Sequence, residues 1–434
     1  MSDNPRLDGL ITRINQSPTP YHATQVAVTR LLERGFVQLD EQETWSLEEG
    51  KGYLVVRDGS SFIAFITPKA PLEQPTQLRL AGAHTDSPSL KLKPNPLKKK
   101  RDQLVWDVEV YGSPILTSWF DRDLSLAGLV SYLDRAGSVQ YQLIDFQSAI
   151  SRIPHLAIHL NKESNNGYAP HRHEELNPIF APAGEEEEPQ QRFFDLLRQQ
   201  LVAQGVAEEE LQQILDWDLS FYDTQPAARS GMKSEWLTGG RLDNLLSCFT
   251  GLEALLDQPS AAQTLPMLAC FDHEEVGSRS AVGADGSFIE AVLRRLFADE
   301  ALFRQNMARA RMISVDNAHG FHPNFAAKQD DNNMPRMGQG VVLKYNANQR
   351  YTTHARSGGW FKALCAQEKL PTQAFTVRSD MGCGSTIGPT VAARLGISSL
   401  DIGVPSWAMH SIRETAAVSD IQTLLAAWAH FYTV

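Results

Sequence analysis

Short apolar segments alternate with helix-forming segments from about residue 235 onward, and this alternation limits the possible folds more than any other feature of the chain. The segments that predict buried strands are 265–272 (LPMLACFD), 311–316 (RMISVD), 374–380 (AFTVRSD) and 398–403 (SSLDIG). Apolar residues recur at helical spacing over residues 242–256 and again over 420–431. Strands that alternate with helices favour an α/β architecture with a largely parallel sheet.

The first 93 residues add elements of the same kind. Helical spacing of apolar residues covers 7–14 and 28–32, and three strand-like runs follow at 53–56, 61–66 and 78–84. We therefore expect an α/β/α domain with a mostly parallel central sheet, built from residues 1–93 and 235–434.

The middle of the chain has a different texture. Residues 105–111 and 139–146 alternate apolar and polar side chains, as half-exposed antiparallel strands do. The basic run 91–102 (KLKPNPLKKKRD) contains two prolines and indicates a solvated linker, and 125–133 is expected to form a helix. We predict that residues 94–234 form a β-rich insertion.

Composition excludes several classes of protein. The chain of 434 residues has a formal net charge of −11, which argues against nucleic acid as a partner because binding to phosphates needs clustered Lys and Arg. The N-terminus lacks a signal-peptide pattern and no apolar run reaches membrane-spanning length, so a soluble cytoplasmic protein is expected. Four scattered cysteines without a CxxC pair predict reduced thiols rather than a disulfide framework.

Acidic residues and histidines follow several of the predicted strands directly. The positions are His84 and Asp86, Glu274 and Glu275, and Asp316 and His319. Carboxyl ends of strands form the ligand crevice of open α/β sheets, and carboxylates that converge there need a cation to relieve their repulsion. Histidine mixed with carboxylate suits Zn²⁺, and also Co²⁺ or Mn²⁺. Without further information, a scattered set of structural salt bridges remains the alternative.

Other site motifs are missing from the sequence. There is no GxxxxGK[ST] loop, no GxGxxG after a strand and no HExxH helix. Seven blocks do resemble, in order from residue 82 to residue 414, those of the M18 aminopeptidases, the aspartyl aminopeptidases. The blocks are AGAHTDSP, GGRLDN, DHEEVGS, SVDNAHGFHPN, LKYNANQRY, RSDMGCGSTIGP and AMHSIRE.

The resemblance implies a site with two zinc ions per subunit, for which Co²⁺ or Mn²⁺ can substitute. The implied ligands are His84, Asp243, Glu275, Asp316 and His410, with Asp243 bridging the metals. Glu274 is implied as the catalytic acid/base that takes a proton from an activated water and returns it to the leaving amine. Asp86 is expected to hold the imidazole tautomer of His84.

The same resemblance implies the substrate and the assembly. Peptides with a free N-terminus, preferably Asp or Glu, would be cleaved. The residues implied to bind them are His159, His319, Lys344, Tyr351, Cys383, Gly384, Ser385 and Thr386. His159 would reach a neighbouring subunit's active site from the insertion, which would serve as a dimerisation domain. Dimers in this family assemble into a tetrahedral dodecamer.

Two other functions stay open from the residues themselves. A co-catalytic deacylase or carboxypeptidase would use comparable ligands but would recognise a substrate carboxylate instead of an amine. A shell without catalysis, acting as a scaffold, is the non-enzymatic alternative. Cys383 is not expected to be a nucleophile, because no base is identifiable beside it, and His171 and His173 are expected to lie in a solvated loop.

Overall fold

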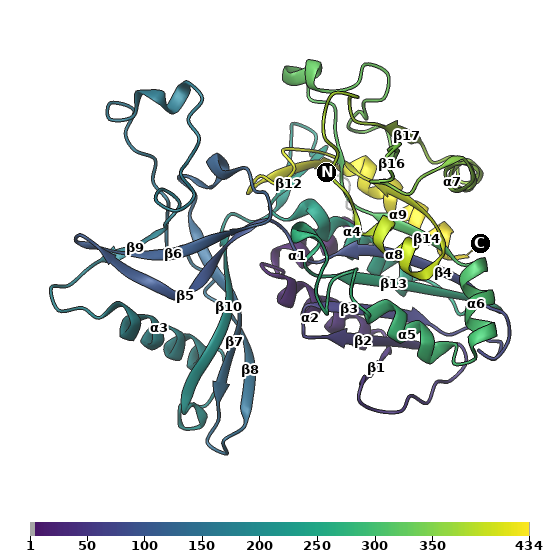
Figure 1. Ribbon diagram of the computed structural model, residues 1–434, viewed down its shortest axis with the longest axis horizontal. Coiled ribbons are helices and arrows are strands. Elements are labelled where there is room, and N and C mark those ends of the chain that lie inside the picture. The colour runs from purple at the N-terminus through teal and green to yellow at the C-terminus, as the bar shows by residue number, and fades with distance from the viewer. Residues whose placement is uncertain (1–4, 434) are drawn as a thin grey trace. The chain divides into compact units, whose positions relative to one another are not determined.

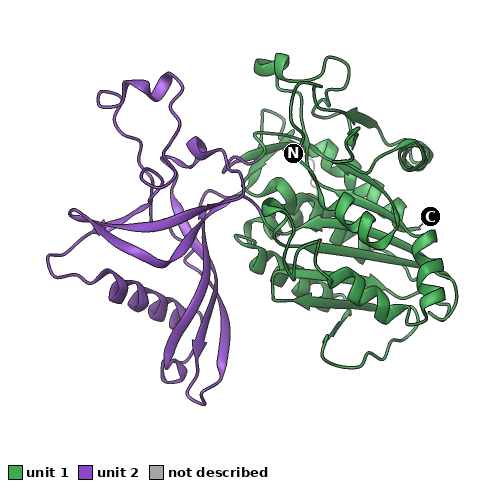
Figure 2. Cartoon of the chain, in the orientation of Figure 1, with its two compact units in different colours: residues 1–86, 227–409, 414–434 green, residues 87–226, 410–413 purple. Residues whose placement is uncertain are grey.

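The computed structural model describes residues 5–433, which form two compact units (Figure 2). Within these residues, unit 1 comprises 5–86, 227–409 and 414–433, and unit 2 comprises 87–226 and 410–413. The sequence predicted the junctions at residues 93 and 234, whereas the contacts divide the chain at 86 and 226.

Unit 1 is built on a central mixed sheet in which parallel pairing dominates (Figure 1). Within the described residues, its order is β1 (Val37–Leu39), β2 (Gly52–Arg57), β3 (Ser61–Ile66), β13 (Thr264–Phe271), β4 (Gln77–His84), β14 (Arg311–Val315), β18 (Ser398–Gly403), β16 (Val341–Lys344) and β17 (Thr372–Phe375). Strands β13, β4, β14 and β18 pair in parallel in this order, so their carboxyl ends lie together on one side of the sheet. We call this side the carboxyl edge and the side with the strand starts the amino edge. The predicted fold class, an α/β domain with a mostly parallel sheet, is confirmed.

Helices cover both faces of this sheet. One hydrophobic cluster contains residues of α1 (Pro5–Asn15), α2 (Pro20–Glu33), α4 (Leu242–Leu256), α7 (Ala355–Gln367) and α9 (Val418–Thr433). The other contains residues of α5 (Phe288–Leu296), α6 (Glu300–Arg309) and α8 (Ile387–Leu395). Strand β13 contributes to both clusters, because successive side chains of a strand point to opposite faces. Met267 and Phe271 lie in the cluster with α5, α6 and α8, whereas Leu268 and Cys270 lie in the other.

A smaller sheet also belongs to unit 1. Its order is β11 (Ala228–Ser230), β12 (Trp236–Gly239), β20 (Glu414–Ala417), β19 (Pro405–Trp407) and β15 (Ala318–His319). Strand β12 leads directly into α4, and β20 leads into α9, so this sheet fixes the starts of two helices. No helix among residues 5–433 is both long enough and apolar enough to cross a lipid bilayer.

Unit 2 is a twisted sheet with one helix packed on it. The strand order is β8 (Val139–Asp145), β7 (Leu124–Leu133), β10 (Gln213–Asp223), β5 (Ser89–Lys100), β6 (Gln103–Tyr111) and β9 (Ile179–Pro182), and the helix is α3 (Pro189–Ala203). Trp106 lies at the centre of its core, in contact with the rings of Phe193 and Phe221.

Two sequence predictions in this unit are wrong. The run 91–102 is no linker, because most of it belongs to β5, which pairs with β6 and buries Leu92 and Leu97 on one face. The register shifts between these two leucines, where Pro94 and Pro96 interrupt the ladder.

The second error concerns residues 125–133, which form β7 and not a helix. Gly128 permits the close pairing of this strand with β10, because a Cβ at this position would lie 1.9 Å from the carbonyl oxygen of Asp218 on that strand. In unit 1, the predicted strand 374–380 ends early, at Phe375.

Candidate metal centre

Residues at or just after the carboxyl ends of three adjacent parallel strands, β13, β4 and β14, lie close together. His84 is the last residue of β4 and pairs in register with Phe271, the last residue of β13. Asp316 follows β14, the neighbour of β4 on its other side. Glu274 and Glu275 lie in the short helical turn η4 (Glu274–Val276) that follows β13.

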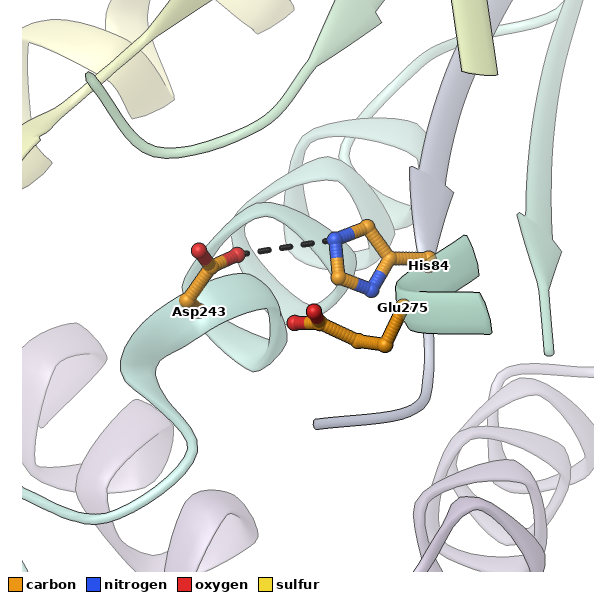
Figure 3. A group of neighbouring side chains, drawn as sticks. All are labelled: His84, Asp243 and Glu275. Atoms are coloured by element: carbon orange, nitrogen blue, oxygen red, sulfur yellow. Dashed lines mark ion pairs between the residues drawn. The ribbon is translucent and has the colours of Figure 1, made fainter. Parts of the chain in front are cut away.

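Asp243 reaches the same place from the start of α4, after a residue in left-handed backbone conformation, Arg241. His84, Asp243 and Glu275 each offer a ligand atom, and these atoms all lie within 4.8 Å of one another (Figure 3). Figure 3 shows both carboxylates beside the imidazole ring, with that of Asp243 joined to the ring by an ion pair. The Nε2 atom of His84 is 3.5 Å from Asp243 Oδ1 and 3.7 Å from Asp316 Oδ1.

Asp86 connects the imidazole to the two glutamates. Its Oδ1 lies 3.3 Å from Nδ1 of His84, on the ring edge away from Asp243. The two carboxylate oxygens accept the backbone N–H groups of Glu274 and Glu275, at 3.2 and 3.0 Å. One buried carboxylate therefore orients the histidine and holds the turn that carries both glutamates.

Burial and neighbouring negative charges shift the pKa values of the residues in this cluster. Burial raises the pKa of Glu274 to about 8, with Asp316, Asp86 and Asp243 adding to the shift and His84 opposing it. Burial also raises the pKa of Glu275 well above its usual value, and the Asp243 carboxylate adds to this. The imidazole of His84 responds in the opposite way: burial lowers its pKa, but the surrounding carboxylates raise it well above 6.5.

These residues fit a divalent cation. The donor set is one imidazole and several carboxylates without a thiolate, which suits zinc and its neighbours in the first transition row. Carboxylates whose pKa is raised by burial and by the charge of neighbouring acids are the groups that a bound cation would stabilise. His84 has its second nitrogen next to Asp86, the arrangement that fixes the tautomer of a ligating imidazole.

Asp316 differs from the other acids because it has a cationic neighbour. The ammonium of Lys344, only 2 % exposed, lies 3.2 Å from Asp316 Oδ2. Although burial raises the pKa of Asp316, Lys344 and His84 hold it well below its usual range. The sequence placed Lys344 among the substrate-binding residues, and in the structure it contacts a predicted ligand directly.

Several predicted substrate-binding residues gather around Phe375. The rings of His319 and Tyr351 lie 5.6 and 6.4 Å from that of Phe375, and Cys383 packs against the same small cluster. Lys344 Nζ is 5.3 Å from the Tyr351 ring centre. Burial raises the pKa of Tyr351 far above its usual value, and Cys383 adds to the shift.

The remaining predicted residues are described by their exposure and their own contacts. Gly384 and Ser385 are exposed, and the hydroxyl of Thr386 donates to buried Asp401 at 2.5 Å. His410 belongs to the segment 410–413 of unit 2, where its Nδ1 is 3.1 Å from the carbonyl oxygen of Ser113. His159 is exposed in a turn of unit 2.

Sequence reasoning missed two residues that support the cluster. Glu414 is buried and accepts the backbone N–H of Asp243 at 2.9 Å. Asn244 donates to the carbonyl oxygen of Val315, which ties the start of α4 to the end of β14. Both residues lie inside the sequence blocks that carry the family resemblance, but nothing in their spacing indicated these contacts.

Comparisons with known proteins agree with this geometry. A family model described as Aminopeptidase I zinc metalloprotease (M18) matches residues 13–432. A protein of Stutzerimonas stutzeri (strain A1501), described as probable M18 family aminopeptidase 2, is 48% identical over 425 residues, which cover 98% of this chain and 97% of that protein.

Solved structures are similar over the same length. A chain of the complex of Ape4 and Nbr1 superimposes with a TM-score of 0.94 at 35% identity, and the match covers 98% of this chain and 85% of that one. The mApe1 dodecamer of S. cerevisiae gives a TM-score of 0.82 at 25% identity, covering 98% of this chain and 95% of that one.

Proposed function

This chain belongs to the M18 family of zinc aminopeptidases, and from that premise we propose that it removes N-terminal residues, preferentially Asp and Glu, from peptides. The observation that carries the proposal is the meeting of His84, Asp243 and Glu275 at the carboxyl edge of the parallel strands. These side chains are separated by up to 191 positions in the sequence, and only the fold brings them together.

We assign the metal-binding role by residue. The residues that would hold two zinc ions are His84, Asp243, Glu275, Asp316 and His410; Co²⁺ or Mn²⁺ would substitute. His410 is included from the family resemblance. When bound, such ions lower the pKa of a coordinated water and polarise a carbonyl group.

The chain's own residues supply proton transfer and positioning. Glu274 takes a proton from the attacking water and returns it to the leaving amine. Its raised pKa supports this role, since a carboxylate that titrates nearer neutral pH can both accept and release a proton during turnover. Asp86 holds Glu274 through its backbone N–H, so the acid/base and the ligand Glu275 are aligned by the same carboxylate.

Specificity for an acidic side chain requires a fixed cation or several hydrogen-bond donors. Lys344, with Tyr351 and His319 nearby, is the proposed source, assisted by donors from the segment Cys383–Gly384–Ser385–Thr386. Because Lys344 already contacts Asp316, we propose that it also keeps this ligand ionised.

We further propose that the protein works as an oligomer. The similar yeast protein is described as a dodecamer, and the sequence predicts that unit 2 makes dimer contacts and presents His159 to a neighbouring subunit. Exposed Leu156, Ile158 and Leu160 flank His159, which is consistent with a surface that becomes covered on assembly.

The proposal is tested by a scan of N-terminal residues. The purified protein is loaded in turn with zinc, cobalt and manganese and offered a peptide library that varies only in its first residue. We expect release of Asp and Glu faster than of Ala or Leu, and no cleavage of peptides whose amine is acetylated. Faster hydrolysis of N-acetyl amino acids than of free-amine peptides would contradict the proposal and favour a deacylase.

A further inference from the structure

A cavity of unusual charge lies at the amino ends of the parallel strands, opposite the ends that carry the metal centre. Its volume is about 490 Å³, within the roughly 300–1,000 Å³ of small-molecule sites. The residues that line it include four arginines, Arg79, Arg309, Arg311 and Arg356. Within the described part of the chain, no Asp or Glu lines it.

The parallel register creates this concentration of charge. Arg311 of β14 is the register partner of Arg79 of β4, so both side chains project from the same face of the sheet, the face that α7 covers. Arg309 comes from the last turn of α6, and Arg356 from the first turn of α7. Four elements of unit 1 therefore contribute one guanidinium each.

Such clustering is unexpected in a chain whose net charge is −11. Arg79 is only 6 % exposed, and its guanidinium donates to Gln77 Oε1 at 2.8 Å. Burial, together with the neighbouring charge of Arg311, lowers the pKa of Arg79 to about 10. Among residues 5–433, the side chains of Arg309, Arg311 and Arg356 enter no ion pair.

The cavity also has an aromatic wall. The guanidinium of Arg311 lies 4.4 Å from the ring centre of Trp360, in a stacked position. Stacking on an indole holds the fork in place while its N–H groups remain directed along the ring plane. The site thus combines preorganised donors with an apolar surface, as small-molecule sites do.

We propose that this cavity is a second binding site, which takes a small phosphate-bearing molecule. A phosphate group carries about two negative charges near neutral pH and three acceptor oxygens, and the guanidinium fork matches two of them at once. A single carboxylate would leave most of the positive charge uncompensated. A volume of about 490 Å³ matches a small metabolite. The assignment does not depend on the peptidase proposal.

The test is a calorimetric titration of the full-length protein with inorganic phosphate at constant ionic strength. We expect saturable binding that weakens by about tenfold in Arg311→Gln and also in Arg309→Gln, because removing one charge-assisted hydrogen bond weakens binding by about that factor. The matched control is Arg304→Gln on the same helix as Arg309, since the Arg304 side chain pairs with Glu300 and does not line the cavity. This variant is expected to bind phosphate as the wild type does.

Two further arms separate the alternatives. Phosphate bound at the metal centre would be lost in Asp243→Asn and retained in the arginine variants, and that pattern would overturn the proposal. Absence of saturable binding would overturn it too. An acidic peptide that binds in an Arg311-dependent manner where phosphate does not would replace it with a peptide site.

Discussion

The two ends of the parallel strands differ in charge although they are only a few residues apart in sequence. Strand β4 carries Arg79 near its start and ends at His84, and β14 starts at Arg311 and is followed by Asp316. Five residues of strand separate the ends by roughly 16 Å. Parallel pairing places like ends together, so one edge gathers acids around an imidazole while the other gathers arginines.

Charge clustering at both ends of these strands follows from topology. In a single strand, a polar or charged residue at either end of the apolar run is ordinary and indicates no site. Only the register of neighbouring strands turns single residues into clusters, and each cluster then has an unfavourable self-energy that a bound ion of opposite sign relieves. We expect a cation at the carboxyl edge and an anion at the amino edge.

The largest expected effect is a difference between variants of the two glutamates at the carboxyl edge, Glu274 and Glu275. Glu274→Gln should lower kcat by about 10²–10⁴-fold, the usual contribution of a general acid/base, while metal content stays near that of the wild type. Glu275→Gln should lose metal, because it removes a proposed ligand. Activity assays combined with metal analysis of both proteins measure this. Metal loss in the Glu274 variant with retention in the Glu275 variant would exchange the two roles.

The second effect concerns Lys344, whose ammonium contacts an acid of this edge, Asp316, directly. Lys344→Ala should lower kcat/KM for Asp-peptides by about 10- to 100-fold more than for Ala- or Leu-peptides, since a charge-assisted hydrogen bond contributes about 1.5–3 kcal/mol. Lys362→Ala, at a lysine on α7 whose ammonium lies near Tyr345, is the control. Equal loss on all substrates, accompanied by weaker metal binding, would leave Lys344 only its role beside Asp316.

The third effect is a pH dependence that reverses when metal is removed. In the metal-free protein the pKa values of Glu274, Glu275 and His84 are raised, so the folded state holds more protons than the unfolded state from about pH 4.5 to 8. Stability must then fall as pH rises through this window. We expect the Tm of chelated protein to drop by about a few degrees between pH 6 and pH 8, because protons bound by the folded state are lost over this range.

Metal-loaded protein should behave oppositely, because cation binding displaces these protons and strengthens with pH. Thermal melts of both forms at the two pH values measure the contrast. Parallel pH curves for the chelated and loaded forms would mean that the acids of this edge do not hold the metal.

Sequence reasoning reached the carboxyl edge because its signals are local. An apolar run followed directly by His84 or by Glu274 and Glu275 can be read without knowing any contact, and the rule for parallel sheets supplies the convergence. The contacts of Lys344 with Asp316 and of Glu414 with Asp243 could not be read in this way, since they join residues 28 and 171 positions apart.

The errors in unit 2 have the same origin. In residues 91–102 the lysines and prolines outweighed the two leucines, Leu92 and Leu97, because a solvated linker and the exposed face of a strand have similar composition. The arginines of the amino edge gave no signal at all. Arg79 and Arg311 become neighbours only through the register of β4 with β14.

The smallest effect tests whether the arginines at the amino edge repel one another when no anion is bound. Arg356 lies in the first turn of α7, where the helix dipole disfavours a cation, and it shares the cavity with three other arginines. Arg356→Gln should therefore raise the Tm by about one degree in phosphate-free buffer. The matched substitution Arg394→Gln should lower it, because Arg394 lies in the last turn of α8 and pairs with Glu290. Saturating phosphate should abolish the gain of Arg356→Gln, since the anion then stabilises the wild type more than the variant. If Arg356→Gln lowers the Tm in both buffers, the arginines do not repel one another and the contrast between the two edges of the sheet fails.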